Sequence, residues 1–277
     1  MKRIQLLPNV LTALGLSCGL FVIFKLNMTG VGAADEQVLK LAAGFLLLAG
    51  LFDLFDGAVA RAMKAESEFG GLFDSLADAI TFGVAPSVIV LKSISAEPGT
   101  FYSFLITAGA LVYSMCGVLR LVRFNVTASK LKKEESEQPV KASFIGLPIP
   151  SAAAAVVSLD FFLLFPNHLN WFTISDTERI YLLFGAMVLI GYLMISQWKF
   201  PSIKHLQTKV GSFRALFLIT LAASLLFYGL IYHFAIVFFA LSWGYLLLSW
   251  ILSLIRWIAG KRAIGLEDFE PEDWEEP

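Results

Sequence analysis

Long runs of apolar residues alternate with short polar segments along most of the chain. A helix needs about 20 mostly apolar residues to cross the roughly 30 Å hydrocarbon layer of a membrane. Runs of about this length are Pro8 to Leu26, Val38 to Met63, Gly71 to Leu91, Phe101 to Leu121, Leu147 to Phe165, Glu178 to Gln197, Ser212 to Tyr232 and Phe234 to Ile258. The pattern therefore predicts an all-α integral membrane protein, a polytopic bundle of about eight transmembrane helices.

The positive charges lie mainly on one side of this arrangement. Of the 21 Lys and Arg residues, all but Lys25, Lys40, Lys92 and Arg179 fall on the side of the N-terminus. Because cytoplasmic loops are enriched in Lys and Arg, we expect both termini in the cytoplasm. Residues 1–258 then form the transmembrane domain, and residues 259–277, which are rich in Asp and Glu, form a cytoplasmic acidic tail.

Composition excludes several classes of protein. The chain is 57% hydrophobic and only 16% charged, and its formal net charge of -1 gives no basic field for nucleic acid. The two cysteines lie far apart, and the three histidines do not share a helical face, so neither a disulfide framework nor a zinc site is expected. The first apolar run is separated by Lys25 and Asn27 from the small residues after it, so we expect it to remain in the mature protein.

Four acids lie inside predicted membrane helices, where a charge costs about 2.5 kcal/mol or more and usually marks function. Asp53 and Asp56 are three residues apart on the second run, and Asp74 and Asp78 are four apart on the third. Each pair therefore shares one helical face. A short link between the runs predicts antiparallel neighbours, with all four carboxylates in one cleft about 10 Å below the cytoplasmic boundary.

Four neighbouring carboxylates repel one another unless protons or cations neutralise them. Oxygen-only ligands favour Mg²⁺ or Mn²⁺, and four carboxylates suffice for two ions. A set of buried protonated carboxyls is the structural alternative. Gly57 and Ala60 either open the helix to a ligand or serve helix packing. Arg61 either meets phosphate oxygens or extends to the membrane surface.

The order Asp53, Asp56-Gly57, Ala60-Arg61, Gly70, Asp74 and Asp78, with two, two, eight, three and three residues between the groups, resembles the signature of the CDP-alcohol phosphotransferase family. The resemblance implies a membrane enzyme, usually a homodimer with a six-helix core. Such enzymes transfer a substituted phosphoryl group from a CDP-linked donor to an alcohol, release CMP and use Mg²⁺ or Mn²⁺. It makes residues 1–258 a catalytic domain with its signature at residues 53–78.

The family's functional residues can be transferred to matching positions. The resemblance implies that Asp53, Asp56 and Asp74 are metal ligands, and that Asp78 is both a ligand and the general base toward the alcohol. It also implies that the cytidine pocket is floored by Gly57 and Ala60. We expect the CDP group to be bound by Asn9, Asp53, Gly57, Ala60 and Arg61.

Four segments resemble the phosphatidylserine synthase branch of this family: Leu7-Pro8-Asn9 with Thr12, Phe73 to Pro86, Val118 to Val126, and Phe144 to Ala154. The branch implies CDP-diacylglycerol and L-serine as substrates. Asn9 opens the first helix, where free N–H groups favour phosphate, although a plain N-cap is the alternative.

We expect Arg120, Arg123 and Asn125 to contact the serine carboxylate or the donor's phosphates. Anchoring at the membrane surface is the simpler explanation of the two arginines.

The predicted reaction is attack of the serine hydroxyl on CDP-diacylglycerol, with Asp78 taking the proton, at the cytoplasmic face of the cell membrane. Another CDP-alcohol phosphotransferase, making phosphatidylglycerophosphate or phosphatidylinositol phosphate, is the alternative within the family. An ion-coupled transporter would also place acids in the membrane, but it predicts acids near the midplane and repeated halves. A structural scaffold would tolerate Asp53→Asn and Asp74→Asn.

Overall fold

The computed structural model describes residues 6–30, 35–63, 67–134, 146–164, 174–196 and 233–263. Every regular element within these ranges is a helix. In chain order they are α1 (Leu6–Asn27), α2 (Glu36–Ala62), α3 (Glu68–Asp78), η2 (Ala79–Val84), α4 (Ala85–Ser93), α5 (Phe101–Glu134), α6 (Ile149–Leu164), α7 (Asp176–Ile195) and α9 (Phe234–Ala263). The all-α prediction is confirmed.

Six spans among the described residues are long and apolar enough to cross a membrane, with α3, η2 and α4 counted as one. The described part of α6 has 16 residues, from Ile149 to Leu164. The predicted run Ser212 to Tyr232 and the two termini lie outside the described residues. The count of eight helices, the cytoplasmic termini and the acidic tail therefore stay predictions.

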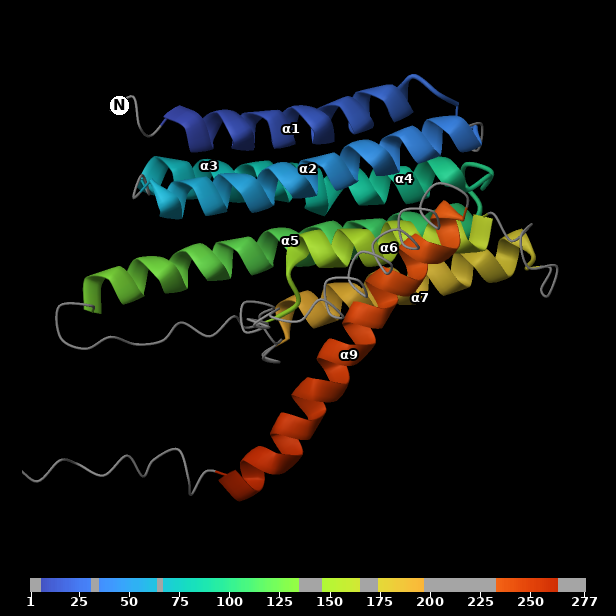
Figure 1. Ribbon diagram of the computed structural model, residues 1–277. Coiled ribbons are helices and arrows are strands. Elements are labelled where there is room, and N and C mark those ends of the chain that lie inside the picture. Colours follow the sequence, from blue (N-terminus) through green and yellow to red (C-terminus); the bar gives the residue numbers. More distant parts are fainter. Residues whose placement is uncertain are drawn as a thin grey trace, which may run out of the picture.

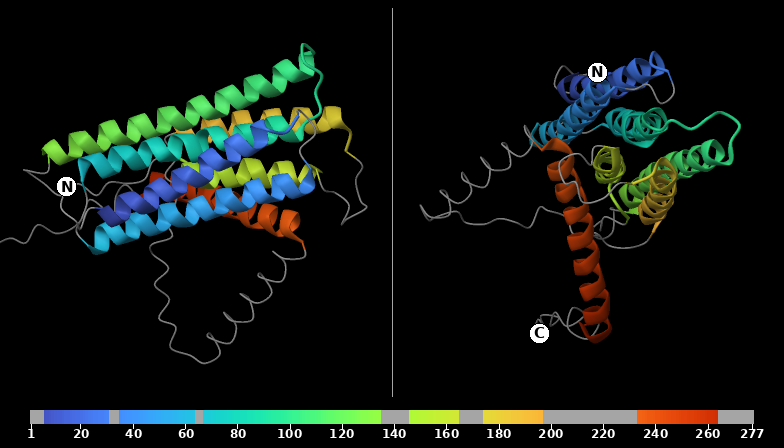
Figure 2. Two further views of the ribbon diagram at one scale, coloured as in Figure 1. Left: turned by 90° about the horizontal axis from the view of Figure 1, so that it is seen from above. Right: turned by 90° about the vertical axis from the view of Figure 1, so that its right-hand side faces the viewer.

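The helices run back and forth along one axis, except α9, which crosses the others obliquely (Figure 1). α1, α2 and the α3–α4 rod form one side, and α5 and α7 pack along each other on the other side (Figure 2). α6 lies between the two sides in the end-on view, and most of its residues are buried. The apolar core is therefore centred on α6.

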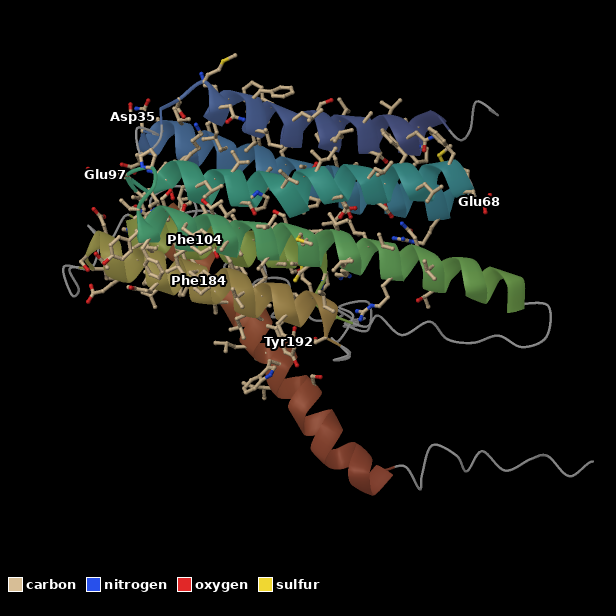
Figure 3. All side chains as sticks on the ribbon, turned by 180° about the vertical axis from the view of Figure 1, so that it is seen from behind. Asp35, Glu68, Glu97, Phe104, Phe184 and Tyr192 are labelled. Carbon is tan, nitrogen blue, oxygen red and sulfur yellow. The ribbon has the colours of Figure 1, made fainter. Side chains whose placement is uncertain are left out.

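The outer surface has polar ends and apolar sides, as a membrane protein requires. Glu68 lies at one end of the bundle, and Asp35 and Glu97 lie at the other (Figure 3). Between them, Phe104 on α5 and Tyr192 on α7 point outward and are largely exposed. The exposed rings suit contact with lipid.

Two helix boundaries differ from those predicted. The fourth run was expected to end at Leu121, but α5 continues to Glu134, because Lys and Glu residues beyond the apolar run are themselves good helix formers. The third run was expected to be one regular helix, but it divides into α3, the π-helical segment η2 and α4.

Pro86 explains the π-helical segment. A proline has no N–H, and its ring clashes with the carbonyl four residues earlier, here that of Phe82. The Tyr113 hydroxyl of α5 donates to the Phe82 carbonyl at 2.8 Å, and the Ser114 hydroxyl donates to the Gly83 carbonyl at 2.9 Å. Side chains of α5 therefore satisfy backbone groups that a regular helix would have satisfied.

α2 and α3 run antiparallel, as predicted (Figure 1). However, each packs more closely against α1 than against the other. Gly19 of α1 allows this arrangement, since a Cβ there would lie 2.5 Å from the Thr81 hydroxyl oxygen of η2. α2 and α3 consequently face each other across a space that α1 closes from one side.

Candidate active site

The predicted acids converge between α2 and α3. One carboxylate oxygen from each of Asp53, Asp56 and Asp74 lies within 4.8 Å of the other two. Asp56 is only 5% exposed, and Asp53 and Asp74 are partly buried. Asp78 lies one turn beyond Asp74 and lines the same two cavities as Asp53 and Asp74. The structure therefore brings together all four acids that the spacing selected.

This cluster fits a hard divalent cation. Its donors are all carboxylate oxygens, which suit Mg²⁺ or Mn²⁺ better than zinc. The negative charge also needs compensation at this depth, because burial strengthens the repulsion between carboxylates. Asp53, Asp56 and Asp74 are the residues that would hold the ion, and Asp78 adjoins them.

Thr12 of α1 holds one of these carboxylates in place. Its hydroxyl lies 2.7 Å from Asp56 Oδ2 and 3.1 Å from the Pro8 carbonyl oxygen, and the residue is 6% exposed. Groups that orient a ligand from behind it are often as necessary as the ligand. Sequence reasoning recorded Thr12 only as part of a motif and assigned it no role. The sequence feature that could have revealed this role is a polar residue one turn after Pro8 in an otherwise apolar helix.

Asn9 lies where α1 meets the start of α3. Its Nδ2 is buried and has no hydrogen-bond partner among the described residues. A Cβ built on Gly70 would lie 3.0 Å from Asn9 Oδ1 and 3.0 Å from the Ser67 hydroxyl oxygen, which caps α3. Gly70 is therefore required for the close approach of α1 and α3. The buried amide donor at this contact is Asn9 Nδ2.

The remaining residues expected at the cytidine group lie on the last turns of α2. The Arg61 guanidinium folds back over Gly57, with Nη1 3.3 Å from where a Cβ would stand. Arg61 is exposed, and Ala60 is partly buried. None of these three residues lines the larger cavity at the acids. They form a separate small surface one turn closer to the end of the helix.

A cavity of about 740 Å³ opens from the acids into the bundle. Asp53, Asp74 and Asp78 line it on one side, and Arg120 of α5 lines it on another. Arg120 is only 9% exposed, and its Nε has no partner among the described residues. A buried guanidinium facing carboxylates across a cavity can bind an anionic group between them.

The other two residues expected at the substrate lie near this cavity but do not line it. Arg123 donates from Nη1 to the Ile195 carbonyl at 2.6 Å and so binds the end of α7. Asn125 accepts a hydrogen bond from the Ser75 hydroxyl at 3.1 Å, which joins α5 to the helix that carries Asp74. The structure therefore separates Arg120, in the cavity wall, from Arg123 and Asn125, which connect helices.

Sequence reasoning missed a fifth buried acid. Asp160 of α6 is fully buried and pairs with Arg179 of α7 at 2.6 Å. The Ser93 hydroxyl donates to the same carboxylate at 2.8 Å, so α4, α6 and α7 meet there. The signal was a lone acid in an apolar run with an arginine near the start of the next run. This cluster lies near the end of the bundle opposite the four acids (Figure 1).

The fold and the site define a multi-pass membrane protein with a cluster of acids that could hold a metal ion. Residues 5–198 match the CDP-alcohol phosphatidyltransferase family. The chain belongs to this family, and it is therefore an enzyme rather than an ion-coupled transporter or a scaffold. The family implies CDP-diacylglycerol, an alcohol acceptor and membrane lipid as partners.

The chain is also similar to several relatives named CDP-diacylglycerol–serine O-phosphatidyltransferase. The protein from Helicobacter pylori strain J99 is 31% identical over 258 residues, 93% of this chain and 96% of the relative. The one from Bacillus subtilis strain 168 is 36% identical over 198 residues, 72% and 91% of the two chains. The one from Methanocaldococcus jannaschii is 34% identical over 151 residues, 54% and 59%.

Proposed function

We propose that this enzyme transfers the phosphatidyl group of CDP-diacylglycerol to the hydroxyl of L-serine and releases CMP. The observation that carries the proposal is the cavity that has three of the four acids on one wall and the buried Arg120 on another. This arrangement suits an acceptor with both a hydroxyl and a carboxylate. The names of the relatives, which act on serine, support the same choice.

The acids divide into two roles in this proposal. Asp53, Asp56 and Asp74 hold Mg²⁺ or Mn²⁺, and with Asp78 the set has enough carboxylates for two ions. When bound, the metal neutralises charge on the diphosphate and on the departing phosphate. Thr12 of α1 fixes the orientation of Asp56 through its hydrogen bond to the carboxylate.

Asp78 is the proposed general base. Its carboxylate takes the proton from the serine hydroxyl, and the oxygen attacks the β-phosphorus of CDP-diacylglycerol. A new phosphorus–oxygen bond to serine forms, and the bond to the bridging oxygen breaks and leaves its electron pair on CMP. The position of Asp78, beside the three-acid cluster and in the wall of the same cavity, supports this assignment.

Arg120 is the proposed partner of the serine carboxylate, because it is a buried cation that lines the cavity beside Asp78. For Arg123 and Asn125, the contacts favour a positioning role. The CDP group is assigned to Asn9, with its free amide donor, and to the surface of Gly57, Ala60 and Arg61.

The same proposal includes the setting of the enzyme. Residues 1–258 form its catalytic domain, and residues 259–277 form an acidic tail. We place the enzyme in the cell membrane as a homodimer with its active site open to the cytoplasm. The unequal distribution of Lys and Arg supports this orientation.

The decisive experiment supplies purified enzyme with CDP-diacylglycerol and one acceptor at a time: serine, glycerol 3-phosphate or inositol phosphate. We expect CMP release with serine and formation of phosphatidylserine. Release with glycerol 3-phosphate or inositol phosphate alone would replace the proposed acceptor and leave the family assignment intact.

A single substitution tests the base. Asp78→Asn keeps the shape of the side chain and removes its ability to accept the proton, so we expect a loss of about 100-fold or more in kcat. Full activity of this variant would exclude Asp78 as the base. Glu97→Gln, at the other end of the bundle, is the matched control and should keep wild-type activity.

A further inference from the structure

The cavity at the acids extends beyond the reach of the polar reactants. Along α2 it is lined from Asp53 back to Leu46, seven residues or about 10 Å further into the membrane. Beyond Asp53, its walls on α2 and α6 are apolar, and they include Gly50 and Ala154. Leu51 and Leu54 of the same wall are at least half exposed, so the cavity opens sideways to lipid.

α9 supplies another part of the cavity wall. Phe238 and Tyr245 both line the cavity, and because they are seven residues apart they share one helical face. Leu247 is nine residues after Phe238, so it lies on the opposite face, where it is largely exposed. α9 lies outside residues 5–198, which match the family.

This wall is fixed in place. The Trp243 indole N–H donates to the Ala155 carbonyl of α6 at 3.1 Å. The Phe239 ring stacks on that of Phe162, with 4.4 Å between the centroids. α9 is therefore anchored to α6 through residues on a different face from Phe238 and Tyr245, and it crosses the bundle obliquely (Figure 2).

From these observations we infer that α9 forms one side of the binding groove for an acyl chain of the donor lipid, and that Phe238 and Tyr245 determine which chains fit. This inference rests on the proposed function, since a donor with its diphosphate at the acids has its glycerol and acyl chains at the mouth of this apolar space. The continuity of the cavity from Asp53 to Phe238 selects the donor's own chain as the occupant.

The groove acts through shape and not through apolar burial. An acyl chain in the bilayer is already surrounded by apolar groups, so entering a protein groove gains little hydrophobic free energy. What the groove provides is a fixed direction for the chain, and thereby for the phosphorus to which it is attached. Changes to the wall should therefore alter catalysis with one donor relative to another and leave the acceptor's KM unchanged.

Photo-cross-linking of the full-length wild-type enzyme tests the placement. The probe is CDP-diacylglycerol with a diazirine on one acyl chain, and excess unlabelled CDP-diacylglycerol is the competitor. We expect competed adducts on α9 at or beside Phe238 and Tyr245. Competed adducts that avoid α9, or that fall on it only around Leu247, would overturn the inference. They would still show that the donor binds, so the proposed function would stand. A complete lack of competed adducts would instead refute the proposed function.

Kinetics with chosen donors test the selectivity. Phe238→Ala and Tyr245→Ala widen the groove, so we expect the ratio of kcat/KM for a branched-chain donor to that for a straight-chain donor to rise about tenfold. Leu247→Ala removes a similar apolar side chain from the outer face and should leave the ratio unchanged. Tyr245 is only partly buried, so Tyr245→Ala alone can test the inference if Phe238→Ala does not fold. Equal ratios in all three variants and the wild type would overturn the inference.

Discussion

Thr12 illustrates how the site depends on single residues behind the acids. Its hydroxyl is buried between Asp56 and the backbone of its own helix, where no substrate needs to touch it. The hydrogen bond restricts the carboxylate to one orientation. Loss of a group in this position commonly lowers metal affinity or activity by about 10–100-fold.

Thr12→Val therefore should weaken catalysis without changing the size of the side chain. We expect a drop of about 10–100-fold in activity, together with a higher Mg²⁺ or Mn²⁺ concentration for half-maximal rate. Titration of the rate against each metal measures both effects. Thr12→Ser keeps the hydroxyl and should stay close to wild type; an equal loss in both variants would contradict the assigned role.

Asp160 and Arg179 give a second prediction for single residues. Asp160→Asn leaves the Arg179 cation buried without its counter-ion, so we expect a loss of about 3–5 kcal/mol in stability. Thermal unfolding in detergent measures it. The double variant Asp160→Leu/Arg179→Met replaces the whole pair by apolar groups and should recover most of the loss. A double variant less stable than Asp160→Asn would contradict this account.

Among the elements, the rod formed by α3, η2 and α4 combines two different functions. Its first part carries Asp74 and Asp78, and its last part carries Ser93, which joins the buried ion pair near the other end. η2 separates the two parts, and α5 satisfies its carbonyls through Tyr113 and Ser114. The rod is therefore anchored at its middle as well as near both ends.

Tyr113→Phe tests this anchoring. The substitution removes the donor to the Phe82 carbonyl and leaves a buried acceptor without a partner, which costs about 1–3 kcal/mol. Thermal unfolding should show the loss, and amide hydrogen exchange in residues 79–84 should become faster. Tyr102→Phe, also on α5, changes a partly exposed hydroxyl and should have little effect. Similar losses for both variants would argue against a special role for Tyr113.

The sequence predicted the helices and the four acids well, because long apolar runs and acids within them are local signals. It did not predict η2, because an apolar run hides a change of helical period and Pro86 alone does not show which carbonyl it displaces. Asp160 was missed because a lone acid reveals no partner until α6 and α7 are packed. The position of α9 beside the acids depends on tertiary packing, which no local pattern in the sequence records.

At the scale of the whole molecule, the two polar clusters differ in charge balance. Near one end, Asp160 and Arg179 neutralise each other. At the other, three of the four clustered acids line a cavity with the buried Arg120, so negative charge is in excess among the described residues there. A divalent cation that binds the folded protein at this site should therefore stabilise the whole bundle. The gain is about 2.7 kcal/mol when the ion is at 100 times its dissociation constant.

Thermal unfolding with and without Mg²⁺ or Mn²⁺ measures this gain. We expect the midpoint temperature to rise with metal concentration and to fall back when a chelator is added. Asp56→Asn and Asp74→Asn should abolish most of the rise, while Glu97→Gln, outside the site, should retain it. A rise that persists in both site variants would place the stabilising ion elsewhere.

The position at which α6 begins has a consequence for how the substrates meet. Its first turn, from Ile149 to Ser151, lines the cavity together with Asp74 and Asp78. The acids are expected about 10 Å below the cytoplasmic boundary, so a helix that begins beside them begins below the membrane surface. Water can follow the space above the start of α6 down to the acids, while the lipid donor stays at its ordinary depth in the membrane. A soluble alcohol and an insoluble donor thus meet without either having to leave its own solvent.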